Sequence, residues 1–188
     1  CKNEPEDKDA FEDDNGCPDP DNDKDGIADA SDKCINDPET VNSFEDTDGC
    51  PDTVPIAIKK FTGTIEGLTF KVASAEILAT SNPKLDEAVK VLIEYPTLKI
   101  EIQGHTDDRL LLPGSAFPDN QALSQARADA VKDHLVKKGI AADRLVAKGF
   151  GDSQPIATIT AADGQPLKGA ALDTARTKNR RVEFHPIP

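Results

Sequence analysis

The chain has 188 residues, of which 35 are acidic and 22 are basic, so its formal net charge is −13. This acidity argues against general nucleic-acid binding. No apolar stretch reaches the roughly 18 to 20 residues of a membrane-spanning helix. The sequence contains no methionine, so we expect it to be part of a longer precursor.

The charge divides the chain into two segments. Residues 1–54 contain 19 acidic and 4 basic residues and all four cysteines, whereas residues 55–188 contain 16 acidic and 18 basic residues. The second segment is long enough for one ordinary hydrophobic core. The first segment cannot bury enough apolar surface to fold by itself. We therefore expect disulfides or metal ions to hold the first segment, or expect it to be disordered.

The acidic segment contains an internal repeat. Residues 1–19 and 34–52 align without a gap at a period of 33 and share 11 of 19 residues. A period of this kind is typical of arrays of short units. Between the two copies, residues 21–32 have acidic side chains at positions 1, 3, 5, 9 and 12 of the run and Gly26 at position 6. Calcium prefers six to eight oxygen ligands, and a glycine permits the sharp turn between them.

This segment resembles thrombospondin type 3 repeats, in which aspartate-rich turns wrap calcium ions. The resemblance covers residues 1–54 and lies in the DxDxDGxxDxxD run together with the FED and GCPD motifs. The resemblance and the spacing predict calcium ligands at Asp21, Asp23, Asp25, Asp29 and Asp32 and at the carbonyl of Ile27. Weaker candidates for neighbouring ions are Asp7, Asp9, Asp13, Asn15, Asp46, Asp48 and Asp52. The alternative is a solvated acidic linker without metal.

The four cysteines allow three disulfide pairings. Pairing Cys17 with Cys34 would leave Cys50 with only the distant Cys1, whereas Cys1–Cys17 and Cys34–Cys50 give two identical loops, one in each repeat. We therefore predict the disulfides Cys1–Cys17 and Cys34–Cys50. Zinc ligation is an alternative, although no CxxC pair is present, and Cys1 as a lipidated residue is another. Disulfides indicate an oxidising compartment, the periplasm or the cell exterior of a bacterium.

From Pro55 onward, the hydrophobic periodicity predicts regular elements. Short apolar runs at 56–61 and 67–70 indicate strands, and residues 83–95 have the spacing of an amphipathic helix capped by Ser81 or Asn82. A strand at 98–102, a helix at 120–138, and strands at 145–149 and 181–184 follow. The order β-α-β-α-β-β predicts an α+β fold, with one mixed sheet and two helices on a single face.

Candidate binding residues follow the strand at 98–102. Asp107 lies just beyond the end of this strand, and Asn120 and Arg127 lie in the first two turns of the next helix. Ligands gather at such strand ends, and a helix N-terminus offers N–H groups to an anion. Arg127 suits a carboxylate and Asp107 suits an ammonium group. The pair therefore suits a zwitterion, and the alternative is a structural salt bridge.

Four motifs resemble those of the OmpA-like C-terminal domain: GHTD at 104–107, NxxLSxxRAxAV at 120–131, GFGDSQPIA at 149–157 and NRRVEF at 179–184. The resemblance covers about residues 56–186 and implies non-covalent binding of peptidoglycan through the diaminopimelate of its stem peptide. It implies that Asp107 contacts the ammonium group and Arg127 the carboxylate, supported by Asn120, Arg180 and the backbone of Thr106. It also implies a place at the periplasmic face of the outer membrane of a Gram-negative bacterium, with the membrane attachment in a region before Cys1.

Two stretches, 108–119 and 158–178, are longer than the family pattern. The apolar residues of the first could cover the pocket mouth, pack on the sheet or contact a partner, and the glycines and proline of the second indicate an irregular loop. Enzyme activity is not expected, because the three histidines lie in no nucleophile or metal-ligand motif. The adjacent Asp107 and Asp108 also have poor geometry for a two-carboxylate hydrolase. The alternative function is a calcium-stiffened adhesion or interaction protein in which wall binding is incidental.

Overall fold

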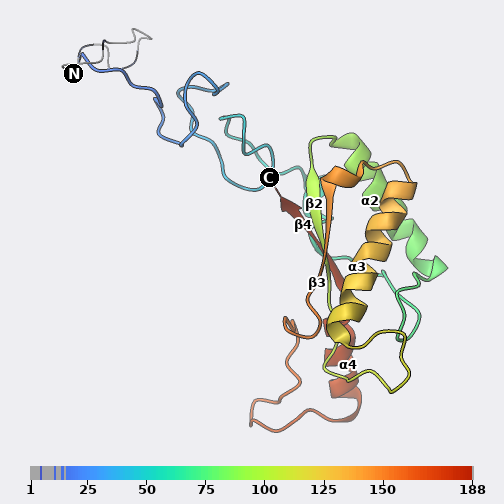
Figure 1. Cartoon of the computed structure of the whole chain (residues 1–188). Helices are drawn as coiled ribbons and strands as arrows, with labels where there is room; N and C mark the ends of the chain where they lie inside the picture. The colour runs from blue at the N-terminus through green and yellow to red at the C-terminus, as the bar shows by residue number, and fades with distance from the viewer. Residues whose placement is uncertain (1–4, 6–10, 12–13, 15, 188) are drawn as a thin grey trace. The chain divides into compact units, whose positions relative to one another are not determined.

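The computed structural model describes residues 5, 11, 14 and 16–187, and it forms two compact units, Cys1–Pro55 and Ile56–Ile187 (Figure 1). The described part of the first unit consists of turns and bends, without a helix or strand. A disulfide joins Cys34 to Cys50 across a sequence separation of 16, which confirms one predicted pairing. The other predicted pairing, Cys1–Cys17, involves a residue outside the described ones.

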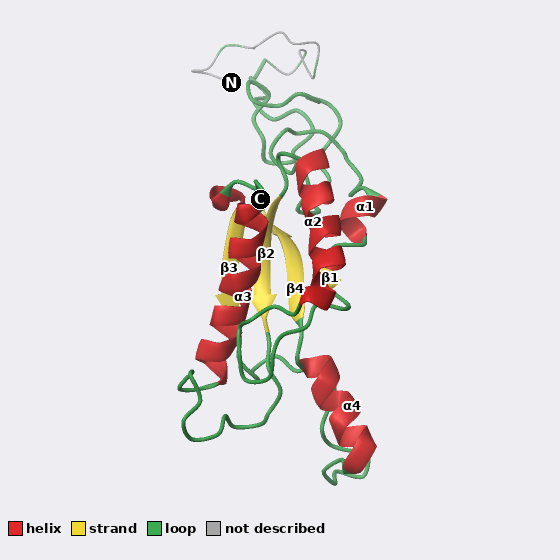
Figure 2. Ribbon diagram, turned by 90° about the vertical axis from the view of Figure 1, so that its right-hand side faces the viewer, coloured by secondary structure: helices red, strands yellow, loops and turns green. Residues whose placement is uncertain are grey.

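The second unit is built on a four-stranded mixed sheet in the order β1-β4-β2-β3 (Figure 2). The strands are β1 (Gly63–Thr64), β2 (Lys99–Gly104), β3 (Leu145–Gly149) and β4 (Val182–Ile187). Strand β2 is parallel to β3 and antiparallel to β4, and β4 is antiparallel to β1. Because β2 and β3 are parallel, their C-terminal ends meet at the same edge of the sheet.

The alternation of side chains gives the sheet one apolar and one polar face. Ile102 and Phe184 are paired in register and are 0% and 2% exposed, and Phe184 lies opposite side chains of α2. On the other face, Glu101 forms an ion pair with Lys148. The apolar face therefore receives the helices, which confirms the predicted α+β arrangement with helices on one face.

Four helices and two 3-10 turns complete this unit: α1 (Ile56–Lys59), η1 (Ala79–Ser81), α2 (Asn82–Glu94), α3 (Asn120–Lys137), η2 (Ala142–Arg144) and α4 (Gly169–Asn179). Helices α2 and α3 confirm the two predicted helices to within one residue at each end. The buried side chains of α2 recur at helical spacing, as an amphipathic helix requires. No helix in the described ranges combines the length and the apolar composition needed to span a bilayer.

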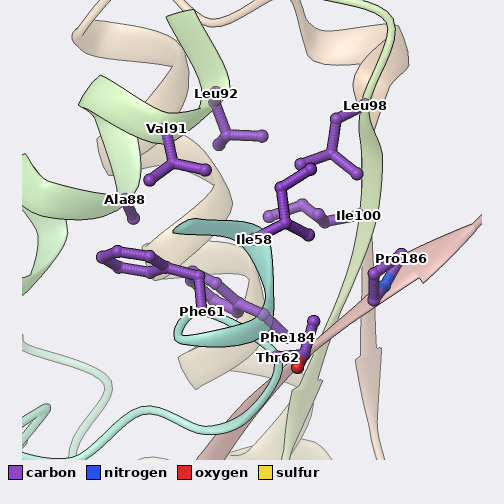
Figure 3. A pocket seen from close by; sticks show the side chains of 10 residues that line it. All are labelled: Ile58, Phe61, Thr62, Ala88, Val91, Leu92, Leu98, Ile100, Phe184 and Pro186. Atoms are coloured by element: carbon purple, nitrogen blue, oxygen red, sulfur yellow. The ribbon is translucent and has the colours of Figure 1, made fainter. Parts of the chain in front are cut away.

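The structure corrects the two strands predicted before residue 71. Residues 56–61 begin with the one-turn helix α1, and in 67–70 only Phe70 forms an isolated bridge, to Ile77. A short apolar run does not distinguish a strand from a buried helical turn by periodicity alone. Tertiary packing favours the helical turn here, because it buries Ile58, which is 1% exposed. Ile58 and Phe61 line a crevice of about 10 Å³ between α2 and the sheet (Figure 3).

The stretch 158–178, predicted as irregular loop, contains most of helix α4. Only Ala175 and Asn179 of this helix are buried, so it has no strong hydrophobic periodicity to detect. Gly169 indicated a loop in the sequence, but it is the first residue of the helix and has a φ of +54°. The helix is held by ion pairs that involve residues far away in the sequence, as described below.

Candidate functional site

Two glycines bring α3 close to the ends of β2 and β3. Gly104 and Gly149 are paired in register and are the last residues of their strands. A Cβ atom at Gly104 would lie 2.2 Å from the backbone oxygen of Ser124, and one at Gly149 would lie 2.3 Å from the backbone nitrogen of Gln125. Only glycine permits this approach of helix and sheet. The first turns of α3 therefore lie beside the turn that follows β2.

That turn holds Asp107 in a buried position with several positive neighbours. Asp107 is 6% exposed. Its Oδ1 accepts a hydrogen bond of 3.0 Å from the backbone N–H of Arg109, and its Oδ2 forms ion pairs with Arg109 and Arg180. The side chain of Asn120 donates hydrogen bonds to the backbone oxygens of Asp107 and Arg109, at 3.1 and 3.0 Å. The first residue of α3 thus fixes the turn on which Asp107 lies.

Arg127 is a buried cation on the next part of α3. It is 8% exposed, its Nε donates a hydrogen bond of 3.0 Å to the backbone oxygen of Ser74, and its guanidinium carbon lies 5.0 Å from the ring centroid of Phe70. Burial lowers the pKa of Arg127, the charge of Arg180 lowers it further, and Asp107 opposes both effects. Within the described ranges, no carboxylate lies at ion-pair distance from Arg127. A buried cation of this kind is unfavourable unless an anion joins it.

Two other predicted residues, Arg180 and Thr106, are engaged inside the protein. Arg180 lies at the C-terminal end of α4, and besides its ion pair with Asp107 it donates a hydrogen bond of 2.9 Å to Thr177 Oγ1. The backbone N–H of Thr106 donates to the backbone oxygen of Gly151 at 2.8 Å, so this N–H is not available to a ligand. The hydroxyl of Thr106 is buried and has no hydrogen-bond partner in the described structure.

Three residues of the site were not indicated by the sequence. Arg109 covers one side of Asp107 with a side chain that is 52% exposed. Asp108 accepts two hydrogen bonds from Arg176 of α4, at 2.7 and 2.6 Å, and this contact lowers the pKa of Asp108. Arg109 and Arg176 belong to the two long stretches, 108–119 and 158–178, whose contacts only the folded structure shows. The adjacent aspartates thus differ in their partners.

The site presents one buried carboxylate, on Asp107, and one buried guanidinium, on Arg127, that has no ion-pair partner among the described residues. Asp107 can accept a hydrogen bond from an ammonium group, and Arg127 can donate two parallel hydrogen bonds to a carboxylate. With Arg109 and Arg180 included, three arginines surround one aspartate. This excess of positive charge favours a ligand with at least one carboxylate.

Outside this site, His105 is the most buried of the three histidines. It is 1% exposed, its ring lies 5.3 Å from that of Phe150 in a stacked arrangement, and neither ring nitrogen has a hydrogen-bond partner in the described structure. Burial lowers the pKa of His105 to about 4, and Arg181 contributes to this shift. A neutral imidazole without partners is part of the packing.

In the first unit, Asp21, Asp23 and Asp25 form a compact cluster, with one carboxylate oxygen from each lying within 4.8 Å of the others. One oxygen of Asp21, of Asp23 and of Asp32 is buried without a hydrogen-bond partner, and Asp32 is 9% exposed. Burial raises the pKa of Asp23, and the charges of Asp25, Asp32 and Asp21 raise it further. Buried oxygens that repel one another in this way match the donor set of a hard cation such as calcium.

Other predicted calcium ligands are used within their own loops. Asp29 accepts a hydrogen bond of 3.0 Å from the backbone N–H of Asn22. Asp46 accepts three hydrogen bonds, of 2.8 to 3.2 Å, from the backbone N–H groups of residues 42–44. Asp25 Oδ1 accepts a hydrogen bond of 2.7 Å from the backbone N–H of Ile27, whose carbonyl is the predicted ligand. The predicted ligands Asp7, Asp9, Asp13 and Asn15 lie outside the described residues.

A second acidic group surrounds Glu39, which the sequence did not indicate. Both carboxylate oxygens of Glu39 and one oxygen of Asp52 are buried without a hydrogen-bond partner in the described structure. Burial raises the pKa of Glu39, and the charges of Asp52 and Asp48 add to this effect. The internal repeat could have indicated Glu39 as a candidate, because Glu39 aligns with the identical Glu6 of the first copy.

Comparison with known proteins places the chain in a family. The model of the OmpA family matches residues 69–168, which is more than half of the chain. The chain therefore belongs to the OmpA family. Membership of this family agrees with the expectation that the protein is not an enzyme.

The curated relatives include outer membrane porin F of two Pseudomonas species. The chain is 42% identical to that of Pseudomonas fluorescens over 94 residues, which are 49% of this chain and 23% of the porin. It is 30% identical to that of Pseudomonas aeruginosa over 164 residues, which are 87% of this chain and 40% of the porin. The second match is longer than the 55–188 segment, so it extends into the acidic segment. The chain spans less than half the length of either relative.

Solved structures share the fold of the second unit. A putative MotB-like protein from Desulfovibrio vulgaris is 27% identical, with a TM-score of 0.55, and the match covers 66% of this chain and 71% of that protein. The cell wall anchor of the T6SS from Pseudomonas aeruginosa is 32% identical, with a TM-score of 0.50, and the match covers 61% of this chain and 71% of the anchor.

Proposed function

We propose that the second unit binds peptidoglycan non-covalently and so anchors the outer membrane to the cell wall. The observation that carries this proposal is the buried guanidinium of Arg127, which lies near Asp107 and has no carboxylate partner among the described residues. Membership of the OmpA family and the similarity to a structure described as a cell wall anchor support the proposal. The similarity to outer membrane porins supports a location at the periplasmic face of the outer membrane. The Cys34–Cys50 disulfide fits that oxidising compartment.

The ligand that fits this pair is the free amino-acid centre of diaminopimelate in the stem peptide. Its carboxylate meets Arg127, and its ammonium group meets Asp107. The Arg109 side chain is half exposed, so it can move aside or contact the same carboxylate when the ammonium group binds. A lysine-type stem peptide lacks the second carboxylate and leaves Arg127 without its anion.

The test is co-sedimentation of the whole chain with purified sacculi. Asp107→Asn keeps an acceptor for the Arg109 N–H but removes the charge that meets the ammonium group, so retention should fall about thirty-fold or more. The matched control is Asp143→Asn, an exposed aspartate in η2. Diaminopimelate-type sacculi should retain the wild type better than lysine-type sacculi. Equal retention of wild type and folded Asp107→Asn on diaminopimelate-type sacculi would refute the proposed site.

For the first unit, we propose a calcium-stiffened spacer between the membrane and the wall-binding unit. The unpartnered oxygens of Asp21, Asp23 and Asp32 form the first expected site, and those of Glu39 and Asp52 indicate a second. Burial and, after it, the repulsion of neighbouring carboxylates raise the pKa values of Asp23 and Glu39, and calcium would neutralise that repulsion. Affinities of about 10⁻⁴ to 10⁻³ M, typical of extracellular modules, would suffice where calcium is abundant.

Calorimetry with calcium, together with small-angle scattering in calcium and in chelator, tests the spacer. Asp23→Asn should weaken calcium binding, while Asp37→Asn, an exposed residue outside the clusters, should not. Heat of binding and a change of dimensions are both expected for the wild type. An absence of calcium binding, with the same dimensions in both buffers, would leave the solvated acidic linker as the correct description.

A further inference from the structure

The carboxylate of Asp107, which the proposed function assigns to the ligand's ammonium group, already contacts two cations of the protein. Its Oδ2 atom lies 3.3 Å from Nε of Arg109 and forms a close ion pair with Nη1 of Arg180. Two donors use both lone pairs of a carboxylate oxygen. The Asp107 side chain is also only 8% exposed. A ligand ammonium group can therefore bond to Oδ2 only after one of the two guanidinium groups has left it.

Arg180 is the more firmly held of these two arginines. It lies at the C-terminal end of α4, and its Nη2 donates a hydrogen bond of 2.9 Å to Thr177 Oγ1 in addition to the ion pair with Asp107. Its charge also lowers the pKa of Arg127, so it lies close to the guanidinium that is expected to hold the ligand's carboxylate. Displacing Arg180 would break two contacts and would move a cation away from the anion.

Arg109, by contrast, combines a fixed backbone with a loosely held side chain. Its backbone N–H donates to Asp107 Oδ1 at 3.0 Å, and its backbone oxygen accepts a hydrogen bond of 3.0 Å from the side chain of Asn120. Its side chain is 52% exposed and, within the described ranges, hydrogen-bonds only to Asp107. A change of rotamer can therefore move the guanidinium into solvent while the turn and α3 stay in place.

We propose that the Arg109 guanidinium is a stand-in for the ligand's ammonium group, which neutralises Asp107 in the free protein and is displaced when the ammonium group binds. This inference rests on the proposed function, because it describes how the same site exchanges its cation. The exchange lowers the affinity of every ammonium ligand by the same factor. A plain amine gains nothing at Arg127 and stays unbound, whereas a zwitterion also gains the contact of its carboxylate with Arg127.

Calorimetry of the whole chain with diaminopimelate tests the displacement. Loss of an exposed ion pair changes an equilibrium by about 1.4- to five-fold, so Arg109→Met should bind diaminopimelate about two- to five-fold tighter than the wild type. The matched control is Lys178→Met, because Lys178 is exposed on α4 near Arg180 and forms no ion pair in the described part of the chain. This control loses the same charge and should bind like the wild type.

Three results of this titration would overturn the proposal. Weaker binding by Arg109→Met would show that Arg109 contacts the ligand's carboxylate. Unchanged binding would show that Arg109 is not displaced. An equal gain in Lys178→Met would reduce the effect to long-range charge.

The Nε–H group of Arg109 gives a second readout by NMR. It donates to Asp107 Oδ2 in the free protein, so its exchange with water should accelerate when diaminopimelate saturates the site. The Nε–H of Arg144, which donates to the backbone oxygen of Leu98, is the internal reference and should keep its rate. If the Arg109 group stays equally protected at saturation, the displacement is wrong while the proposed function stands. If diaminopimelate does not bind the wild type, the proposed function is refuted and this inference with it.

Discussion

Replacing Arg127 by methionine should abolish most wall binding while leaving the fold nearly as stable. The variant loses the hydrogen bond to the Ser74 oxygen, about 1.5 to 3 kcal/mol for a charged donor, and the contact with Phe70, about 0.5 to 2 kcal/mol. Methionine keeps the unbranched stem and restores part of the aromatic contact, about 0.3 to 1.5 kcal/mol. The variant also removes a buried unpaired cation, whose desolvation penalty is several kcal/mol.

These opposing terms should leave the free energy of unfolding within about 2 kcal/mol of the wild type. Binding should fall by about 2 to 5 kcal/mol, or roughly thirty-fold to several thousand-fold, because the ligand carboxylate loses its charged donor. Urea unfolding measures the first quantity, and calorimetry with a diaminopimelate-containing stem peptide measures the second.

Arg144→Met is the matched control, because Arg144 donates hydrogen bonds to the backbone oxygens of Leu92, Tyr95 and Leu98. It should lower the free energy of unfolding by about 2 kcal/mol or more, since three carbonyls lose a charged donor, and it should leave binding intact. If Arg127→Met binds like the wild type, or loses as much stability as Arg144→Met with binding unaffected, then Arg127 is a structural residue and the reasoning is wrong.

Three further changes follow from packing, burial and covalent links. Gly104→Ala should lower the free energy of unfolding in urea by about 3 kcal/mol or more, because its Cβ would overlap the backbone of α3; an unchanged midpoint would contradict this. Burial and Arg181 lower the pKa of His105 from 6.5 to about 4, so the unfolded chain takes up a proton at higher pH than the folded one. Stability should therefore fall by about 3 kcal/mol at most as pH drops from 6.5 towards 4, and melts of His105→Phe should lose this slope. Serine at both Cys34 and Cys50 removes a constraint of about 3 kcal/mol on the unfolded loop and should weaken calcium binding by calorimetry; equal affinity would show that the loop is fixed without the disulfide.

The sequence predicted the parts of the fold that local patterns encode. Helices α2 and α3 carry buried side chains at helical spacing over several turns, and β2 and β3 are short strands that end in glycine. Helix α1 and helix α4 lack such a signal. Helix α1 is a single turn whose buried residue is Ile58, and α4 is held largely by ion pairs to the turn at 107–108 rather than by an apolar face. Contacts between residues far apart in the sequence therefore stabilise both of these helices.

In the candidate site, too, some features follow from local sequence patterns and others depend on contacts between distant residues. The sequence by itself determined that Asp107 follows a strand and that Arg127 lies early in the next helix, because strand ends and helix turns are local features. It could not determine which charges neutralise one another, since ion pairing depends on distances across the fold. Only the tertiary structure separated Asp108, which Arg176 holds with two hydrogen bonds, from Asp107, and showed Arg127 buried without an anion. Arg127 lies on α3, which approaches the sheet closely because Gly104 and Gly149 carry no side chain, so the burial of Arg127 follows from packing that no local pattern records.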